Sequence, residues 1–211
     1  ARDRREQLER PARSSGSSSG LPAHRVVSLR IVSGQFRGRR IEAPAGRSTR
    51  PTREAVREAW FNVLGDRVVG ARVLDLFAGS GALGFEALSR GAAHVHFVES
   101  DRTVLSVLRR NIQVLGVGSR AEVTRADALA LVAVPERVAA GAWDLVLADP
   151  PYDGDAAVEL VSAFSRGAFP GILCVEHAVR VDFPVEPDWQ RRYGESVLSI
   201  FLDASEGATH G

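Results

Sequence analysis

The stretch Arg72–Gly84, Arg-Val-Leu-Asp-Leu-Phe-Ala-Gly-Ser-Gly-Ala-Leu-Gly, specifies the class of fold. Its apolar run, Val73–Phe77, is typical of a strand buried on both faces of a sheet. Small residues at 78–81 allow a sharp turn and a close approach of the backbone to a ligand. Ala82–Arg90 then predicts a helix that ends at Gly91. A strand, a glycine turn and a helix in this order place free N–H groups at the carboxyl edge of a parallel sheet, where such sheets bind ligands.

The glycine spacing fits two chemistries. Gly79, Gly81 and Gly84 form a G-x-G-x-x-G, and Glu99 closes the next apolar run, where a dinucleotide fold keeps its ribose-binding acid. Asp75 lies in the strand before the turn, where a carboxylate would repel a pyrophosphate and attract a cationic ligand with an amino-acid head. S-adenosylmethionine carries a sulfonium and an α-amino group and no phosphate, so Asp75 favours this ligand. The alternative is that Asp75 only caps local backbone N–H groups.

Length and composition limit the class of protein. A chain of 211 residues suits one α/β domain with an appendage. The sequence contains no apolar run near the roughly 20 residues that span a membrane, and no secretory signal. A single cysteine, Cys174, excludes an internal disulfide framework and a Cys-based zinc site. We therefore expect a soluble, cytoplasmic protein with no membrane partner.

The charge is distributed unevenly along the chain. Residues 1–60 hold 14 Arg against 6 acidic residues, and residues 61–211 hold 13 Arg against 20, although the whole chain has a net charge of +1. A basic arm on an acidic body indicates a polyanionic partner held by the arm. The alternative is a solvated basic tail.

The basic arm itself predicts a hairpin and a helix. Residues 1–25 are polar and are expected to be a disordered basic tail or a segment that is not native to the protein. Two short β-like runs, Leu29–Val32 and Arg39–Glu42, flank turn residues and predict a hairpin that presents Arg37, Arg39 and Arg40. A helix with Thr52 as its N-cap is expected to run to about Leu64.

The remaining chain alternates between strands and helices. Further strands are predicted at 95–99, 121–125, 143–148 and 171–176, helices at 101–115, 127–134 and 155–165, and a closing β pair at 189–194 and 197–203. This alternation is typical of a doubly wound α/β fold. We predict three parts: an arginine-rich extension at 26–68, the main domain at 69–205 and a tail at 206–211.

Acidic residues follow the predicted strands in order. Asp75, Glu99, Asp127 and Asp149 all end or follow strands, so they line one crevice at one sheet edge. Glu99 is placed to accept from both ribose hydroxyls, and Asp127, with the Ala128 backbone, could accept from an adenine amine. Any one of them alone would be an ordinary helix-capping residue. The ordered set of four favours a ligand site.

The most specific signal is Asp149-Pro150-Pro151-Tyr152. Two prolines remove two N–H groups and fix the backbone, which suits an ordinary turn into a helix poorly. The rigid turn presents the Asp149 side chain and the Pro150 carbonyl as acceptors, which the exocyclic amine of a nucleobase needs before it can attack a methyl group. Tyr152 supplies a face on which the base can stack. The alternative is a Pro-Pro turn with a capping Asp.

These motifs together resemble a known family. Asp-Leu-Phe-Ala-Gly-Ser-Gly-Ala-Leu-Gly, Glu99, Asp127 and Asp-Pro-Pro-Tyr resemble a class I S-adenosylmethionine-dependent methyltransferase that acts on an amino nitrogen. The arm motifs, Arg30-Ile-Val-Ser-Gly, Arg37-Gly-Arg-Arg, Arg50-Pro-Thr-Arg and Arg57-Glu-Ala-Trp-Phe-Asn, with Leu88-Ser-Arg-Gly-Ala-Ala, resemble the RsmD family more narrowly. That family methylates the N2 amine of one guanine in bacterial 16S rRNA. The resemblance covers about Leu29–Asp203.

The resemblance implies a Rossmann-like fold with a seven-stranded, mostly parallel sheet, helices on both faces, and an N-terminal β-hairpin and helix. It implies S-adenosylmethionine as cofactor, and 16S rRNA or the small ribosomal subunit as partner of a monomeric enzyme. The expected site residues are Asp149, Pro150, Pro151 and Tyr152 for catalysis; Asp75, Phe77, Ala78, Gly79, Ser80, Gly81, Gly84, Glu99, Ser100, Asp127, Ala128 and Asp149 for the cofactor; and Arg37, Arg39, Arg40, Arg50, Thr52, Arg53 and Arg57 for RNA.

Other functions stay open at this point. A DNA adenine-N6 methyltransferase also uses Asp-Pro-Pro-Tyr, but the chain shows no target-recognition domain. A nicotinamide-dependent oxidoreductase is disfavoured by Asp75 and by Asp149–Tyr152, and a non-catalytic RNA-binding or ribosome-assembly protein could keep the same fold. His94 and His96 share a strand face without a third ligand, so we expect no metal. Cys174 lacks the Pro-Cys setting of a cytosine-C5 methyltransferase.

Overall fold

The computed structural model describes residues 26–44, 51–139, 143–152, 155–168 and 171–203. The strands are β1 Val26–Arg30, β2 Arg40–Pro44, β3 Arg72–Leu76, β4 His94–Glu99, β5 Ala121–Arg125, β6 Leu145–Ala148, β7 Ile172–Ala178, β8 Trp189–Tyr193 and β9 Ser196–Leu202. The helices are α1 Pro51–Leu64, α2 Ala82–Ser89, α3 Arg102–Leu115, α4 Ala128–Val132, α5 Pro135–Ala139 and α6 Ala156–Ser165, with 3-10 turns η1 Gly65–Val68 and η2 Gly118–Arg120.

The central sheet of the described chain has seven strands in the order β5-β4-β3-β6-β7-β9-β8, and β1 and β2 form a separate antiparallel hairpin. Strands β3 to β7 run parallel, whereas β9 is antiparallel to both β7 and β8. The predicted Rossmann-like sheet, including its closing β pair, is confirmed. The chain moves outward from β3 to β5 and then returns to β6 on the other side of β3. This switch point is where open α/β sheets form their ligand crevice.

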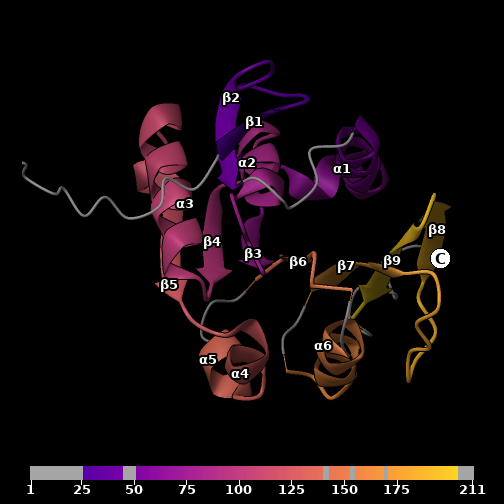
Figure 1. Ribbon diagram of the computed structural model, residues 1–211. Helices are drawn as coiled ribbons and strands as arrows, with labels where there is room; N and C mark the ends of the chain where they lie inside the picture. The colour runs from indigo at the N-terminus through magenta and orange to yellow at the C-terminus, as the bar shows by residue number, and fades with distance from the viewer. Residues whose placement is uncertain (1–25, 45–50, 140–142, 153–154, 169–170, 204–211) are drawn as a thin grey trace, which may run out of the picture.

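Side chains of the parallel strands alternate between two apolar clusters, as expected for strands buried on both faces. Val73 of β3 packs in the cluster that includes α1, α2 and α3. Leu74 and Leu76 pack on the opposite side, with α4 to α6. Figure 1 shows these two groups of helices on opposite sides of the sheet.

The hairpin docks on α2 through polar contacts that sequence reasoning did not identify. Both carboxylate oxygens of Glu86 accept backbone bonds at 2.9 Å, one from the N–H of Val32 and the other from that of Ser33. Gly34 has a φ of 77°, and a Cβ there would lie 1.9 Å from the carbonyl oxygen of Ser89. The glycine is therefore required by close contact between the hairpin turn and the end of α2.

This docking explains why the hairpin strands differ from those predicted. The first strand ends at Arg30 rather than Val32, because the amides of Val32 and Ser33 bond to Glu86. The helix that follows begins at Pro51, which suits the first helical position because proline has no N–H to leave unpaired. Thr52 therefore lies inside the first turn and is not the N-cap that the sequence predicted.

Three other elements differ from expectation, and the first is strand β6, which begins at Leu145 rather than at residue 143. The segment after Asp127 contains two short helices, because α4 ends at Val132 and Pro135 begins α5. Strand β7 continues to Ala178, two residues beyond the prediction, because Ala178 pairs with Ser196 of β9. The strand is extended by a tertiary partner that the local sequence does not reveal.

The hairpin and α1 join the same apolar cluster as the sheet, through side chains such as Ile31, Phe36 and Trp60. The predicted boundary between the arginine-rich extension at 26–68 and the main domain at 69–205 stays a prediction. None of the helices in the described ranges is both long and apolar enough to cross a lipid bilayer.

Candidate active site

The loop between β3 and α2 has a constrained backbone at the carboxyl edge of the sheet. Phe77 has a φ of 58°, the only positive φ of a non-glycine residue in the described chain. Such a conformation costs about 1–3 kcal/mol and persists only where the surroundings enforce it. The Ala78 N–H donates to the Val98 carbonyl at 3.0 Å, and the Gly81 N–H donates to that of Ala78 at 2.8 Å. The loop is thereby fixed to β4.

The three glycines of the G-x-G-x-x-G motif, two in the loop and Gly84 in α2, do not share one role. A Cβ on Gly81 would lie 2.5 Å from the Phe85 ring, and one on Gly84 would lie 2.3 Å from Phe97. These two glycines are needed for packing. A Cβ on Gly79 would meet only the carbonyl of Phe77, at 3.8 Å. Gly79 therefore presents open backbone on the side where a ligand could approach.

Two carboxylates hold the loop. Asp75 is 1% exposed, and its Oδ2 accepts from the Gly84 N–H at 2.9 Å. Glu99 is also buried; its Oε2 accepts from the Gly79 N–H at 2.9 Å and its Oε1 from the Asp101 N–H at 2.8 Å. The contact of Asp75 is the one that the capping alternative predicts, and its attraction of a cationic ligand stays a prediction. Each Glu99 oxygen has a second lone pair for a ligand hydroxyl.

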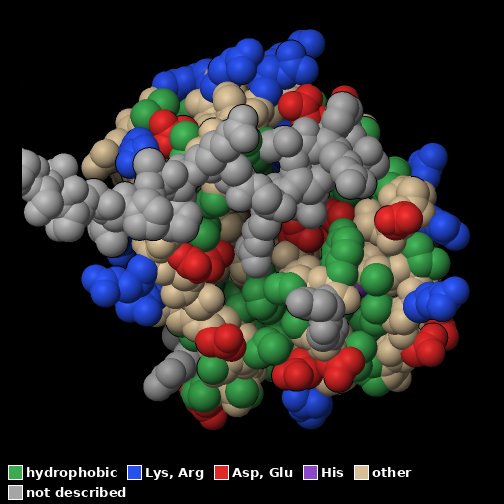
Figure 2. Space-filling model, viewed as in Figure 1, with side chains coloured by type: hydrophobic (Ala, Val, Ile, Leu, Met, Phe, Trp, Pro, Cys, Tyr) green, Lys and Arg blue, Asp and Glu red, His purple; other side chains and the backbone are tan. Residues whose placement is uncertain are grey.

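The crevice concentrates negative charge. Burial raises the pKa of Asp75 to about 8, the Gly84 N–H lowers it, and the charges of Asp149 and Glu99 raise it further. Three carboxyl groups therefore interact at the point where β3, β4 and β6 end. Such a crevice disfavours a pyrophosphate and favours a cation. Figure 2 shows acidic side chains in the middle of this face and basic ones along its top, over the hairpin.

The remaining residues predicted to bind a cofactor lie on the same edge of the sheet. Asp127 is exposed and caps α4, with its Oδ1 accepting from the Ala130 N–H at 2.8 Å, and Ala128 beside it is buried. The carbonyl of Ser100 accepts from Arg125 Nε at 3.3 Å. The carbonyl of Ser80 accepts from Asn111 at 3.0 Å. Asp127 is therefore a helix cap in this structure, and its contact with an adenine amine stays a prediction.

The Asp-Pro-Pro-Tyr turn follows β6 directly. Asp149 is half-buried and close enough to Asp75 to influence its pKa, whereas Pro150 is buried and Pro151 is exposed. Tyr152 is 45% exposed, and its hydroxyl donates to Glu176 Oε1 at 2.5 Å. The structure thus brings the turn and the glycine loop to the same switch point, as the sequence predicted.

The arginines predicted to bind RNA separate into different environments. Arg37 and Arg40 are exposed. Arg39 donates to the carbonyls of Val114 and Leu115, which end α3. Arg39 therefore also serves as a cap for that helix.

Arg57 requires a correction. It is 6% exposed, its Nη2 donates to the Arg30 carbonyl at 2.8 Å, and its Nε lies 3.8 Å from Glu86. A guanidinium that is buried in this way cannot bind a phosphate of RNA, so the role of Arg57 is structural. Arg50 lies outside the described residues, as do the side chains of Thr52 and Arg53.

Sequence reasoning missed several polar residues that connect the parts of the site. They are Glu86, Ser89, Asn111 and Glu176, all buried. Asn111 bonds both the N–H and the carbonyl of Glu42 at 2.8 Å, and also the Ser80 carbonyl, so it joins β2 to the glycine loop. The sequence feature that could have identified these residues is a polar residue within an otherwise apolar segment, as for Glu86 in α2.

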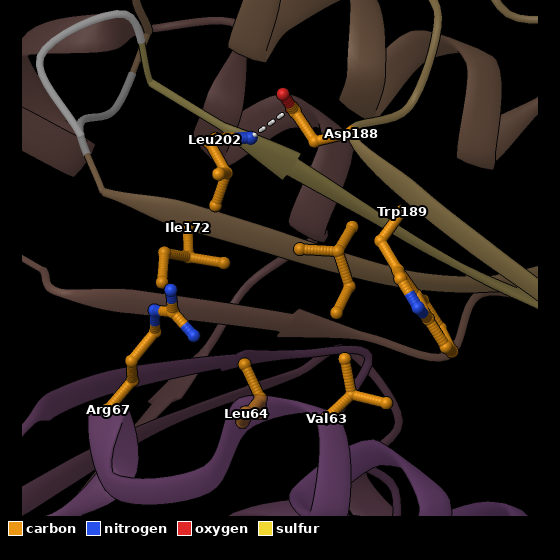
Figure 3. Close-up of a pocket in the computed structure, with 8 residues that line it drawn as sticks. Val63, Leu64, Arg67, Ile172, Asp188, Trp189 and Leu202 are labelled. Atoms are coloured by element: carbon orange, nitrogen blue, oxygen red, sulfur yellow. Dashed lines mark hydrogen bonds between the residues drawn. The ribbon is translucent and has the colours of Figure 1, made fainter. Parts of the chain in front are cut away.

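A cavity of about 270 Å³ lies at the opposite edge, where β7 begins (Figure 3). Its lining residues are Val63, Leu64, Arg67, Ile172, Asp188, Trp189, Ile200 and Leu202. None of these residues belongs to the glycine loop or to the Asp-Pro-Pro-Tyr turn. Within the described residues, no group of three or more His, Cys, Asp or Glu side chains is arranged to hold a metal ion.

Comparison with known proteins matches almost the whole described chain to one family. Residues 29–201 match the family model described as Conserved hypothetical protein 95. Ribosomal RNA small subunit methyltransferase D of Escherichia coli (strain K12) is 36% identical over 162 residues, which cover 75% of this chain and 79% of that protein. The Haemophilus influenzae protein of the same name is 39% identical over 135 residues, covering 64% of this chain and 69% of that one.

A solved structure agrees with these matches. A hypothetical protein from Thermus thermophilus superimposes with a TM-score of 0.70 at 30% identity, covering 83% of this chain and 99% of that chain. The similarity therefore extends through the sheet and the N-terminal hairpin, and not only through the glycine loop.

Proposed function

The chain belongs to the RsmD family, whose model is described as Conserved hypothetical protein 95, and from this membership we propose that it methylates the exocyclic N2 amine of a guanine in 16S rRNA. The methyl donor in this proposal is S-adenosylmethionine. The observation that carries the proposal is the meeting of Asp149–Tyr152 with the glycine loop at the switch point between β3 and β6. One group of residues binds the donor, and the other receives a nucleobase amine.

The loop and its acidic neighbours fit the donor. Gly79 leaves open space above the backbone, and the carboxyl groups of Asp75 and Glu99 favour a cationic ligand. We assign Glu99 to the ribose hydroxyls and Asp127 to the adenine amine. When bound, S-adenosylmethionine supplies a methyl group on a positively charged sulfur.

The protein's own residues act on the attacking amine. The lone pair of a guanine N2 amine is delocalised into the ring, so it is a weak nucleophile. Hydrogen bonds from its N–H groups to Asp149 and to the Pro150 carbonyl localise the lone pair and fix its direction. The amine becomes acidic once methylated, so its proton leaves to Asp149 or water without a strong base. The Tyr152 ring supports the base, which is turned out of its RNA stack.

The raised pKa of Asp75 predicts pH-dependent binding of the donor. Asp75 is largely protonated in the free protein below about pH 8, and a bound cation favours its ionised form. Binding then releases a proton, so affinity for S-adenosylmethionine should increase between pH 6 and 7.5 by up to about tenfold per pH unit. Titration calorimetry in buffers of different ionisation enthalpy measures both the affinity and the proton release. D75N should abolish this dependence, and a dependence that survives in D75N would contradict the assignment.

RNA is proposed to bind over the hairpin, where Arg37 and Arg40 are exposed. Reversing both charges (R37E/R40E) should weaken binding of 16S rRNA fragments at low salt. The logarithm of the RNA association constant decreases linearly as the logarithm of the salt concentration increases. The steepness of this decrease should be smaller by about 2 in the variant, since each lost phosphate contact reduces it by close to 1. Fluorescence anisotropy at several salt concentrations measures the RNA affinity. The control is R166E/R191E, which makes the same change in charge at exposed positions outside the hairpin. Arg39 is avoided because it caps α3. Equal loss in both variants would mean that the hairpin has no specific role.

The function itself is tested by transfer of labelled methyl groups to unmethylated small ribosomal subunits, naked 16S rRNA and duplex DNA. Label in N2-methylguanine of either RNA sample is the expected result, and comparison of the two samples identifies the assembly stage of the substrate. Label in adenine of DNA would instead make the protein a DNA methyltransferase. Binding of the donor without transfer would indicate a non-catalytic RNA-binding protein. A cytoplasmic location follows from an rRNA substrate, and the monomeric state stays a prediction.

A further inference from the structure

One contact of the active-site turn is not explained by the chemistry above. The hydroxyl of Tyr152 donates to Glu176 Oε1 at 2.5 Å, although the ring is 45% exposed. Glu176 lies on β7 and is 8% exposed, as is Ser196 at the start of β9. A buried carboxylate bound to the tip of an exposed ring is an arrangement that packing alone does not require.

The topology brings these residues together. Ala148, the last residue of β6, pairs with Val175, so Glu176 lies one residue further along the neighbouring strand, beside the Asp-Pro-Pro-Tyr turn. On its other side β7 pairs with β9, where Leu198 faces Glu176 and Ser196 faces Ala178. The Ser196 side chain is also within interaction range of the phenol. Strand β7, which is distant in sequence from the turn, thus supplies the acceptor of the Tyr152 hydroxyl.

The contact fixes the ring at both ends. Pro150 and Pro151 restrict the backbone that carries Tyr152. The hydrogen bond from a phenol to a carboxylate is charge-assisted and short, so it holds the far end of the side chain. The free face of the ring therefore keeps one orientation before a base arrives. Preorganisation of this kind reduces the ordering that must occur during substrate binding.

We propose that Glu176 is a positioning residue, which holds the Tyr152 ring as the platform for the target guanine. Glu176 acts through the tyrosine hydroxyl and not on the reacting atoms. Within the part of the chain that the structure describes, no ion pair joins Glu176 to a cation. Its negative charge is therefore available to the phenol. This proposal rests on the proposed function, because it assumes a nucleobase as the group that stacks.

The first test is a double-mutant cycle on methyl transfer to 16S rRNA or the small subunit. E176A and Y152F should each lower kcat/KM by about 10- to 100-fold, the range expected for misplaced reactants. E176A should add less than about twofold in the Y152F background, because the hydroxyl through which it acts is already absent. E176Q keeps an acceptor oxygen and should restore activity to within about threefold. E195A, which removes an exposed carboxylate next to Ser196, is the matched control.

The second test does not depend on activity. Burial and the Glu176 carboxylate both raise the pKa of the Tyr152 phenol above its ordinary value. Tyr193 is the only other tyrosine, so a Y193F background isolates the phenolate absorbance of Tyr152. E176A should then shift its ionisation to lower pH, and E195A should not.

The outcomes separate the two proposals. An unaltered protein that transfers no methyl group would overturn the proposed function, and the phenol titration would still decide whether Glu176 holds the hydroxyl. An active protein in which E176A matches E195A would overturn the positioning role alone. The positioning role also fails if E176A is equally harmful with and without Y152F, because Glu176 would then act independently of the tyrosine. If E176A does not fold, the titration is made with E176Q, which removes the carboxylate charge and should also shift the ionisation of Tyr152 to lower pH.

Discussion

Replacing Asp149 with alanine should lower the rate of methyl transfer by roughly 10²–10³-fold or more, the range for loss of one preorganised electrostatic partner. The carboxylate is half-buried at the switch point, next to the strained loop that begins at Phe77. Its loss removes an acceptor that localises the lone pair of the amine. Affinity for S-adenosylmethionine should change little, because the loop is held by Asp75 and Glu99.

Single-turnover kinetics with saturating RNA and donor separate this effect from binding. Asp155 provides the control, since it lies near the same turn, is exposed and makes no side-chain cap to α6. D155N should keep a rate within about twofold of the unaltered protein. If D149A retains turnover, Asp149 is not the acceptor. If D149A instead loses the donor, the residue belongs to cofactor binding.

The largest effect on stability is expected at Glu86, which is 0% exposed. Its oxygens accept from Val32 and Ser33, bond Arg90 Nε at 3.0 Å, and lie 3.8 Å from Arg57. E86A leaves the N–H groups of Val32 and Ser33 without acceptors. It also removes the main negative charge beside the buried guanidinium of Arg57. Breaking a buried ion pair from one side costs about 3–5 kcal/mol, so the free energy of unfolding should fall by about that amount.

Urea denaturation measures the loss, with E58A on the exposed face of α1 as the control. Hydrogen exchange at Val32 and Ser33 should accelerate in E86A, because these amides lose their acceptor. Adding R57M should recover part of the stability, since it removes the unpaired charge. A loss no greater than that of E58A would show that Glu86 does not hold the hairpin. Hairpin docking would then depend on apolar contacts alone.

The position of the hairpin has a consequence for RNA binding. Its turn is fixed to Ser89 at the end of α2, and Arg39 caps the end of α3. Helices that follow parallel strands end at the amino edge of the sheet, opposite the crevice. In the proposed complex, an RNA that contacts Arg37 while its guanine enters the crevice therefore extends along the molecule.

The order of residues along the chain is enough to predict the fold and the edge on which the site lies. A strand, glycine turn and helix at 72–90 depend on local residue preferences and on hydrophobic periodicity, which short windows contain. The acids after successive strands and the Asp-Pro-Pro-Tyr turn follow from the same logic. Parallel strands bring their carboxyl ends to one edge whatever the details of packing. The position of these residues could therefore be predicted without the structure.

The roles of individual charged side chains depend instead on tertiary contacts. Arg57 and Arg37 are equivalent as sequence signals, yet burial against Glu86 makes the first structural and leaves the second exposed. Glu176 lies in an apolar segment, and its bond to Tyr152 depends on the pairing of β6, β7 and β9. The physical reason is that burial and hydrogen-bond partners come from residues distant in the chain, whereas helix and strand preferences are largely local.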